Sequence, residues 1–358
     1  MKNQFSIFTK GLISLPILLV AAFLLNQSFI NDESQLPMSV SVCGAEFGQQ
    51  QMPGIMNKDY VYPTAEQMNY YASKGIKQIA LPFRWERIQN GLFGKLDEAN
   101  LREIENTLRF AERNKMGVIL DMHNYGHYRI QDQDLPIGSN EVSIAAYCDA
   151  WKKFAARVKK HNNIVAYQIM AEPHDMGSGV WAKAAQEVIL AIREVDNKTP
   201  ILVDGDGWAS AYNWKKFSDN LKHLKDPANK LVYSAHCYFD ADGSGTYVNG
   251  YQEKYHHEQI GIEKVKPFIE WLQANNKKGF IGEYGVPNND RRWVSVMDRF
   301  LAYLHHHNIG SNYWAAGAWW KNYPLSIEPV QGKEKPQMQV LSAYLSGKTP
   351  IYGDYAIK

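Results

Sequence analysis

Short apolar runs alternate with amphipathic stretches along most of the chain, and this alternation limits the folds open to it. The apolar runs have strand character and cover residues 39–43, 77–83, 117–122, 164–170, 201–204, 231–236, 279–283 and 310–314. Stretches with helical periodicity separate most of them, at residues 64–74, 100–114, 143–160, 180–196, 263–275 and 292–307. About eight strand–helix units in roughly 320 residues predict an α/β protein with one (β/α)8 TIM-barrel domain. An open dinucleotide-binding sheet is disfavoured, because no glycine-rich fingerprint follows the first run.

The first residues form a separate segment. Lys2 and Lys10 precede an apolar stretch at residues 11–25, and a polar stretch follows at residues 31–37. A basic start and an apolar run of this length match a secretory signal, since a comfortable membrane span needs roughly 20 residues. No convincing small-residue cleavage site follows the run, so a retained membrane tether is also open. We therefore predict an export signal or membrane anchor plus linker at residues 1–37, the folded domain at residues 38–358, and an exported location that is periplasmic, extracellular or membrane-anchored facing outward.

Composition indicates one large domain with an uncharged partner. Of 358 residues, 45% are hydrophobic and 13% aromatic, so the chain can bury a substantial core. Lys and Arg number 39 against 37 for Asp and Glu, a balance that provides no global field for nucleic acid or an anionic membrane surface. We expect a neutral partner, no nucleic acid and a monomeric protein.

Cysteine and histidine spacing does not predict a metal centre. Cys43, Cys148 and Cys237 lack the close spacing of zinc sites. Export would permit one disulfide with one thiol left over, but we favour none, because cysteine in a strand-like run packs as a small apolar residue. His123 and His127 imitate a helical metal pair, yet they follow a strand, where this spacing loses its meaning. We predict no metal and no cofactor.

Polar and aromatic side chains follow nearly every predicted strand. Glu172 and Glu283 close the fourth and seventh apolar runs. The other strand-end residues are Glu46, Arg84, His123, Asn124, His236, Tyr238 and Trp314. In a (β/α)8 barrel this end carries the chemistry, and two facing carboxylates could cleave a glycosidic bond. Asp204 and Asp206, after the fifth run, could reach the cleft or cap a turn, and we assign them no role.

Several of these residues also carry a resemblance to a known family. The segments are Pro82-Phe83-Arg84-Trp85-Glu86-Arg87, Asp121-Met122-His123-Asn124-Tyr125, Glu172-Pro173-His174-Asp175, His236-Cys237-Tyr238-Phe239-Asp240 with Ser244-Gly245-Thr246, Gly282-Glu283 and Trp314-Ala315-Ala316-Gly317. In this order the chain resembles glycoside hydrolase family 5, the cellulase family of retaining (β/α)8 enzymes, and within it the endoglucanase branch. The resemblance covers nearly the whole chain after the export segment.

The resemblance implies roles for the two glutamates. Glu172 corresponds to the general acid/base, which must hold a proton for the leaving oxygen, and Glu283 to the nucleophile, which must be ionised to attack. Arg84 and Tyr238 near Glu283 would favour its charged form. A retaining mechanism predicts carboxyl groups roughly 5 to 5.5 Å apart.

The same resemblance implies substrate-binding and supporting residues. These are Arg84, His123, Asn124, His236, Tyr238 and Trp314. The two histidines would bind the reacting sugar, and Trp314 would form the surface on which it stacks. Further aromatic residues in or near the predicted loops could line a cleft, and we expect about half of them to be core: Tyr125, Tyr128, Trp208, Trp214, Trp319 and Trp320.

One departure from the family pattern lies beside the acid/base. The family normally has Asn-Glu-Pro, and here the first residue is Ala171. That Asn hydrogen-bonds the sugar 2-hydroxyl, and losing several kcal/mol in the transition state would slow cleavage by about 10² to 10⁴-fold. Another side chain could replace the Asn, the natural sugar could be modified at its 2-position, or this copy could be weakened.

The predicted activity is retaining, endo-acting hydrolysis of β-1,4-glucan, with a neutral polysaccharide or oligosaccharide as substrate. β-Mannanase, glycolipid-cleaving and exopolysaccharide-trimming activities stay open, because one scaffold serves many substrates in this family. The rival from another class is a catalytically impaired carbohydrate-binding relative, which Ala171 makes conceivable. Retention of both Glu172 and Glu283 argues against it.

Overall fold

The computed structural model describes residue 1 and residues 36–347. The predicted export signal or anchor therefore lies almost wholly outside the described residues, and its identity stays a prediction. Within the described part, no helix has both the length and the apolar character that crossing a membrane requires.

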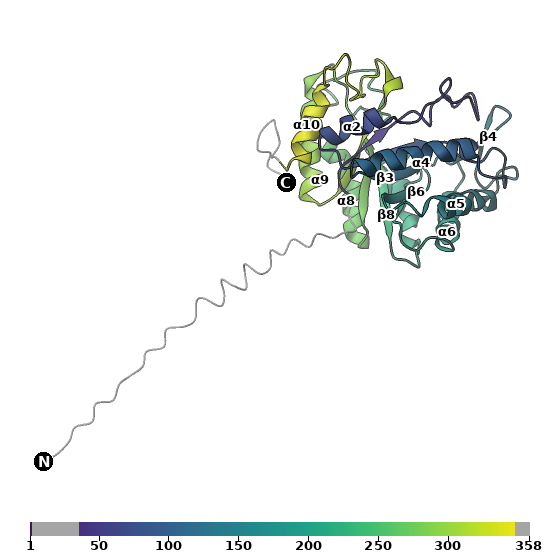
Figure 1. The fold of residues 1–358 in the computed structure, drawn as a ribbon. Coiled ribbons are helices and arrows are strands. Elements are labelled where there is room, and N and C mark those ends of the chain that lie inside the picture. The colour runs from purple at the N-terminus through teal and green to yellow at the C-terminus, as the bar shows by residue number, and fades with distance from the viewer. Residues whose placement is uncertain (2–35, 348–358) are drawn as a thin grey trace. The chain divides into compact units, whose positions relative to one another are not determined.

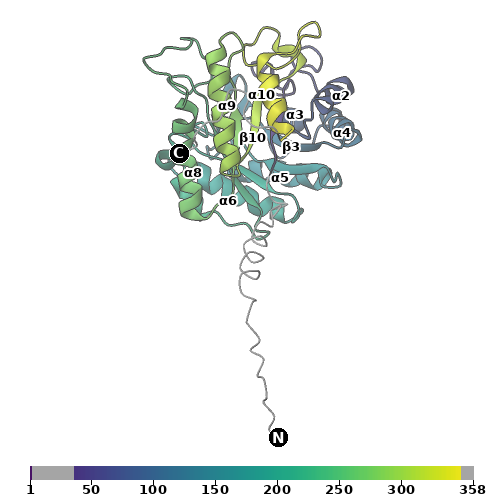
Figure 2. The same cartoon turned by 90° about the vertical axis from the view of Figure 1, so that its left-hand side faces the viewer.

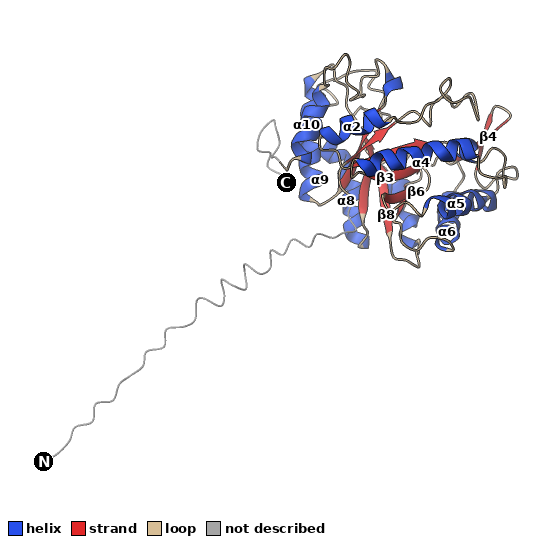
Figure 3. Ribbon diagram, viewed as in Figure 1, coloured by secondary structure: helices blue, strands red, loops and turns tan. Residues whose placement is uncertain are grey.

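Eight parallel strands close into a barrel, as the alternating pattern predicts. They are β1 (Ser39–Val42), β2 (Gln78–Phe83), β3 (Gly117–Met122), β6 (Ile164–Gln168), β7 (Ile201–Asp204), β8 (Leu231–His236), β9 (Gly279–Tyr284) and β10 (Gly310–Ala316). Each pairs with the next along the chain, and β10 returns to pair with β1. The strands lie inside and the helices outside (Figure 3).

The six predicted helices are all present. They are α2 (Ala65–Ser73), α4 (Glu98–Arg113), α5 (Ile144–Val158), α6 (Val180–Arg193), α8 (Ile260–Asn275) and α9 (Arg291–His306), and they surround the strands in Figures 1 and 2. Five further helical elements and a small hairpin were not predicted. These are α3 (Trp85–Ile88), α7 (Trp214–Phe217), η1 (Asp219–His223), η2 (Ala318–Trp320), α10 (Pro336–Leu345), and the hairpin of β4 (His127–Ile130) and β5 (Gln133–Pro136).

Local chemistry accounts for several helix starts. Thr64 caps α2 in a capping box, because its hydroxyl accepts from the Gln67 N–H while the Gln67 side chain accepts from the Thr64 N–H. Asp97 caps α4 and Ser143 caps α5, each accepting an N–H three residues on. These caps satisfy backbone donors that no residue inside the helix can pair.

The core has two parts. The larger cluster lies between the strands and the surrounding helices and includes fully buried tryptophans such as Trp151 and Trp181. The smaller cluster takes one residue from each of six consecutive strands, as expected for the barrel interior: Ala80, Ile119, Ala166, Leu202, Val232 and Phe280, with Leu36 beside them. Since the interior is packed, only the strand ends and their loops are free to build a site.

Candidate active site

Glu172 and Glu283 meet at the carboxyl ends of the barrel strands. Glu283 lies in β9, the seventh barrel strand in chain order, and Glu172 lies four residues past β6, the fourth. One oxygen of each carboxylate lies within 4.8 Å of the other. This spacing agrees with the roughly 5 to 5.5 Å of retaining glycosidases and is shorter than the 6.5 to 9.5 Å that inverting enzymes use.

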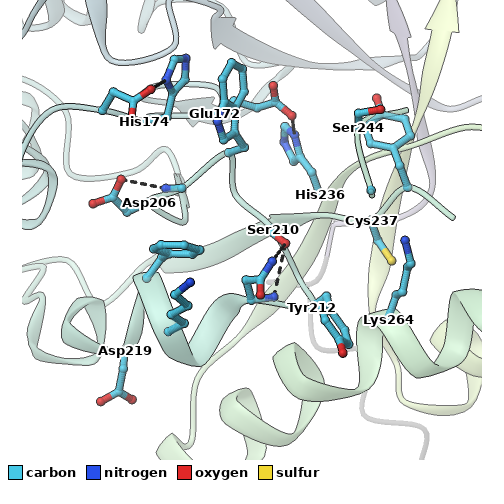
Figure 4. Close-up of a pocket in the computed structure, with 18 of the residues that line it drawn as sticks. Glu172, His174, Asp206, Ser210, Tyr212, Asp219, His236, Cys237, Ser244 and Lys264 are labelled. Carbon is cyan, nitrogen blue, oxygen red and sulfur yellow. Dashed lines mark hydrogen bonds and ion pairs between the residues drawn. The ribbon is translucent and has the colours of Figure 1, made fainter. Parts of the chain in front are cut away.

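His236, the last residue of β8, lies between the two glutamates. Its Nδ1 is 2.7 Å from Glu172 Oε1 and 3.5 Å from Glu283 Oε2, and Figure 4 shows the contact with Glu172. Burial opposes a charge on the ring, but the charges of Glu283 and Asp204, together with the close contacts to Asp204 and Glu172, raise the pKa of His236 well above its usual value. His236 Nδ1 thus faces both carboxylates, and their charges favour the protonated ring.

The two carboxylates have different surroundings. The Glu172 side chain is 16% exposed and that of Glu283 is 7% exposed. Burial raises the pKa of Glu283 to about 7, and the Glu172 charge adds to this, while His236, His123 and the Tyr238 hydroxyl act in the opposite direction. Tyr238 Oη donates to Glu283 Oε2 over 2.8 Å, as predicted for a group that favours the carboxylate.

His123 is a second cation at the site. Its Nδ1 is 2.9 Å from the buried Asp121 carboxylate. Burial works against the charge, but Asp121 and, more weakly, Glu283 and Glu46 raise the pKa of His123 to about 9. The ring stacks on Trp314 with centroids 5.1 Å apart and planes 12° apart. His123 therefore packs along one face of Trp314, which is 8% exposed.

Arg84 and Asn124 both hydrogen-bond to protein groups of the loops around the site. The Arg84 guanidinium donates to Gln49 Oε1 at 2.7 Å and to the Glu46 carbonyl at 3.2 Å, and it lies 5.1 Å from the centre of the Tyr125 ring. The cations that act most on the Glu283 pKa are instead His236 and His123.

Asn124 supports loops. Its amide donates to Glu86 Oε2 and the His127 carbonyl, its oxygen accepts from the Trp85 N–H, and it is 2% exposed.

A cleft of about 1420 Å³ opens from Glu172 on one side. Its walls come from the segments that follow β6, β7 and β8 and from the start of α8 (Figure 4). Three exposed aromatic side chains line it: Trp208 at 50%, Tyr212 at 61% and Phe217 at 41%. His174 stacks under Trp208 with centroids 3.5 Å apart. Of the six aromatic residues singled out from the sequence, Tyr128 and Trp214 are core, and Trp208 is the exposed one.

Ala171 is completely buried. Its N–H donates to the Met122 carbonyl, its carbonyl accepts from the Tyr125 N–H, and none of its surface is exposed. No solvent-accessible pocket therefore borders Ala171, which disfavours an open pocket there for a substituent on the sugar 2-position.

We expect Ala171→Asn to lower the free energy of unfolding by about 1–3 kcal/mol, because a larger side chain must enter a filled space. Activity on β-1,4-glucan should not rise, as measured by kcat/KM on cello-oligosaccharides beside urea unfolding. A gain of about a hundredfold would show instead that the amide reaches the sugar and that Ala171 is a defect.

Glu172, His236 and Glu283 also form a trio whose possible ligand atoms lie within 4.8 Å of one another. A metal ion could use such a trio, but His236 Nδ1 already faces both carboxylates. The ion pairs account for the arrangement of these three side chains.

Asp204 is a residue for which the sequence predicted no role. It ends β7, is fully buried and lies 3.0 Å from His236 Nε2. The only signal in the sequence was an acidic residue at a strand end. The same signal marked Asp206, which lines the cleft and whose carboxylate accepts from the adjacent Gly207 N–H.

A (β/α)8 barrel with two carboxylates this close, beside an aromatic cleft, defines the class: the protein is a glycoside hydrolase. Residues 40–319 match the family described as Cellulase (glycosyl hydrolase family 5). The chain belongs to this family.

Similar proteins are endoglucanases. The probable endo-beta-1,4-glucanase B of Aspergillus oryzae is 33% identical over 308 residues, covering 84% of this chain and 88% of that one. The Pseudomonas stutzeri endoglucanase Cel5A, solved in complex with cellobiose, is 41% identical with a TM-score of 0.83, covering 91% of this chain and 99% of that one. XacCel5A, solved in complex with cellopentaose, is 38% identical with a TM-score of 0.80, covering 87% and 99%.

Proposed function

We propose that this protein is a retaining endo-β-1,4-glucanase in which Glu172 is the acid/base and Glu283 the nucleophile. The observation that carries the proposal is the pair of carboxylate oxygens within 4.8 Å, one just past the fourth strand of the barrel and the other in the seventh. Similarity to endoglucanases, two of them solved with cellobiose or cellopentaose, supports β-1,4-glucan as the substrate.

The surroundings of each carboxylate support this division of roles. Glu172 is the more exposed and lines the cleft, where it can meet the glycosidic oxygen and later a water molecule. Burial disfavours the charge of Glu283, but the Tyr238 hydroxyl, His236 and His123 all favour the ionised form that must attack the anomeric carbon. Attack breaks the bond between C1 and the leaving oxygen, which takes the Glu172 proton, and forms an ester on Glu283. Water then gives its proton to Glu172, and its oxygen replaces the ester oxygen at C1.

The position of the cleft indicates which part of the polysaccharide substrate it binds. Because Glu172 protonates the leaving group and lies at the cleft wall, the cleft accommodates the leaving segment. Trp208, Tyr212 and Phe217 expose flat faces there, on which neutral pyranose rings can stack.

Two measurements on carboxymethyl-cellulose and cellohexaose test the proposal. An endo-acting enzyme lowers the viscosity of the polymer before many reducing ends accumulate, and a retaining enzyme gives the β-anomer first in proton NMR. Exclusive release of a terminal sugar, or the α-anomer as first product, would contradict it. No hydrolysis of glucan, mannan or mixed-linkage glucan would favour the carbohydrate-binding alternative.

We also propose that residues 1–37 direct export, on the basis of the basic and apolar pattern alone. N-terminal sequencing of the protein from separate cell fractions tests this. A cleaved protein free in the medium would support a signal peptide and contradict a membrane tether, whereas an intact chain in the cytoplasm would contradict export.

A further inference from the structure

Asp204 has an unusual concentration of contacts for one buried carboxylate. Its two oxygens accept from Gln168 Nε2 at 3.1 and 3.2 Å, and Oδ2 also accepts from the Glu172 N–H at 3.1 Å. The same Oδ2 is 3.0 Å from His236 Nε2, as an ion pair rather than a well-directed hydrogen bond. No surface of Asp204 is exposed, so it cannot touch a substrate itself. Its two functional neighbours, Glu172 and His236, both line the cleft in which a substrate would lie.

The first neighbour is the backbone of the acid/base. Glu172 has φ +48°, a left-handed conformation that costs a residue with a Cβ roughly 1–3 kcal/mol where the surroundings impose it. The hydrogen bond from its N–H to Asp204 is one of the interactions that hold this conformation. The direction in which the Glu172 side chain leaves the strand end therefore depends on Asp204.

The second neighbour is the imidazole between the catalytic carboxylates. With Asp204 at Nε2 and Glu172 and Glu283 at Nδ1, each ring nitrogen faces a carboxylate. A proton on both nitrogens is then favoured, because a carboxylate can only accept. Gly282 leaves the necessary space, since a Cβ there would collide with Ser234 Oγ and come within 2.9 Å of His236 Nε2.

We propose that Asp204 is a positioning residue for the catalytic pair, which it orders through two links: the peptide N–H of Glu172 and the doubly protonated ring of His236. The inference rests on the proposed function, because it assigns Asp204 a role in the reaction of Glu172 and Glu283. A purely structural Asp204 would contribute to stability only.

The pH dependence distinguishes these roles. The charged groups that face His236 are Glu172, Asp204 and Glu283, and its charge also acts on Asp121. Removing the Asp204 charge lowers the pKa of His236, so the ring loses its proton at lower pH. Without that cation the pKa of Glu283 rises further. Since Glu283 must be ionised to attack, the acidic limb of kcat/KM must move to higher pH.

The test is Asp204→Asn, which keeps the shape and removes the charge. On cellopentaose we expect kcat to fall by about 10- to 100-fold with KM changed less than about threefold, and the acidic limb to rise by at least about half a pH unit. Asp204→Glu, which keeps the charge, should leave the acidic limb of kcat/KM at its wild-type pH. Unchanged kcat and an unchanged limb in Asp204→Asn would overturn the proposal.

Asp226→Asn is the matched control, because Asp226 is also buried and ion-paired, 2.7 Å from Arg193 Nε. It should lose stability in urea without any shift of the acidic limb. If both variants lose stability equally and neither shifts the limb, Asp204 is structural and the proposal fails.

Nitrogen-15 NMR of the wild-type protein gives a readout that needs no variant. Protons on both nitrogens of His236 at pH 7 are expected, and a neutral ring would overturn the proposal. This readout also separates the two hypotheses: absence of glucan hydrolysis would remove the proposed function, whereas a neutral ring in an active enzyme would remove only the role of Asp204.

Discussion

Glu283→Ala should lower kcat/KM on cello-oligosaccharides by about 10⁴ to 10⁶-fold, the scale seen when a nucleophile is removed from an enzyme. The proposed nucleophile is then absent, and the neighbouring Tyr238 hydroxyl loses its partner. Initial rates on cellopentaose, with circular dichroism to confirm folding, measure the effect. Glu270→Gln is the control, because Glu270 is about half exposed and pairs with Lys215 on the outside of the barrel. That control should remain within about twofold of wild type.

Two chemical probes test directly whether Glu283 is the nucleophile. A 2-fluoro cellobioside with a good leaving group should label the wild-type protein once, and peptide mass analysis should place the label on Glu283. Azide added to Glu283→Ala should restore turnover and give a glycosyl azide of inverted configuration, because the anion attacks from the side of the lost carboxylate. Labelling of another residue, or of none across several sugar types, would contradict the assignment.

Glu172→Ala should lower kcat/KM on unactivated β-1,4-glucan by about 10² to 10⁴-fold, the usual contribution of a general acid. The loss should depend on the leaving group. With a dinitrophenyl cellobioside the first step needs no proton and should be nearly normal, so the glycosyl-enzyme accumulates and a burst appears. Azide should then release a glycosyl azide of retained configuration. Equal losses on activated and unactivated substrates would show that Glu172 is not the acid.

The pH profile of the conservative variant Glu172→Gln gives an independent check. The Glu172 charge helps to raise the pKa of Glu283, so its removal lowers that pKa. The nucleophile is then ionised at lower pH, and the acidic limb measured with the activated substrate should move downward from about 7. The basic limb on unactivated glucan should flatten, because no acid remains to lose its proton. An acidic limb that moves upward would contradict the coupling of the two carboxylates.

Glu172→Gln and Asp204→Asn should shift the acidic limb of the pH profile in opposite directions, and this difference distinguishes the roles of the two residues. Both carry negative charge near His236, but Asp204 lies on the far side of the ring from Glu283. Its loss weakens the cation that stabilises ionised Glu283, whereas loss of Glu172 removes a like charge beside it. The same kinetic experiment on the two variants therefore reports two different electrostatic roles.

Much of the fold was predictable, because buried parallel strands and amphipathic helices leave strong local patterns. All eight barrel strands and six of the helices lie where periodicity indicates, whereas the ten-residue α10 was not predicted, and the capping box at Thr64 marks a helix start. Short elements such as α3 and the hairpin of β4 and β5 were missed. They form where tertiary contacts hold them: the Glu86 side chain of α3, for example, accepts from the Arg129 N–H of β4.

Glu172 and Glu283 could be found from the sequence because each ends an apolar run. The carboxyl ends of the parallel strands all lie at the same end of the barrel, which is the end that carries the active site. Their separation followed only from the family resemblance and not from the residues themselves, because it depends on how the fourth and seventh strands close around the core. The partners of Arg84 and Asn124, and the full burial of Ala171, likewise come from residues distant in sequence.

The sequence by itself determined the barrel, the end of the barrel that carries the chemistry and the two glutamates, since hydrophobic period and strand direction are local properties. Only the tertiary structure decided that His236 lies between those glutamates and that Asp204 holds both His236 and the Glu172 backbone. The physical reason is that the charge and orientation of a buried side chain depend on which groups packing places within a few ångströms of it, and those groups come from separate strands.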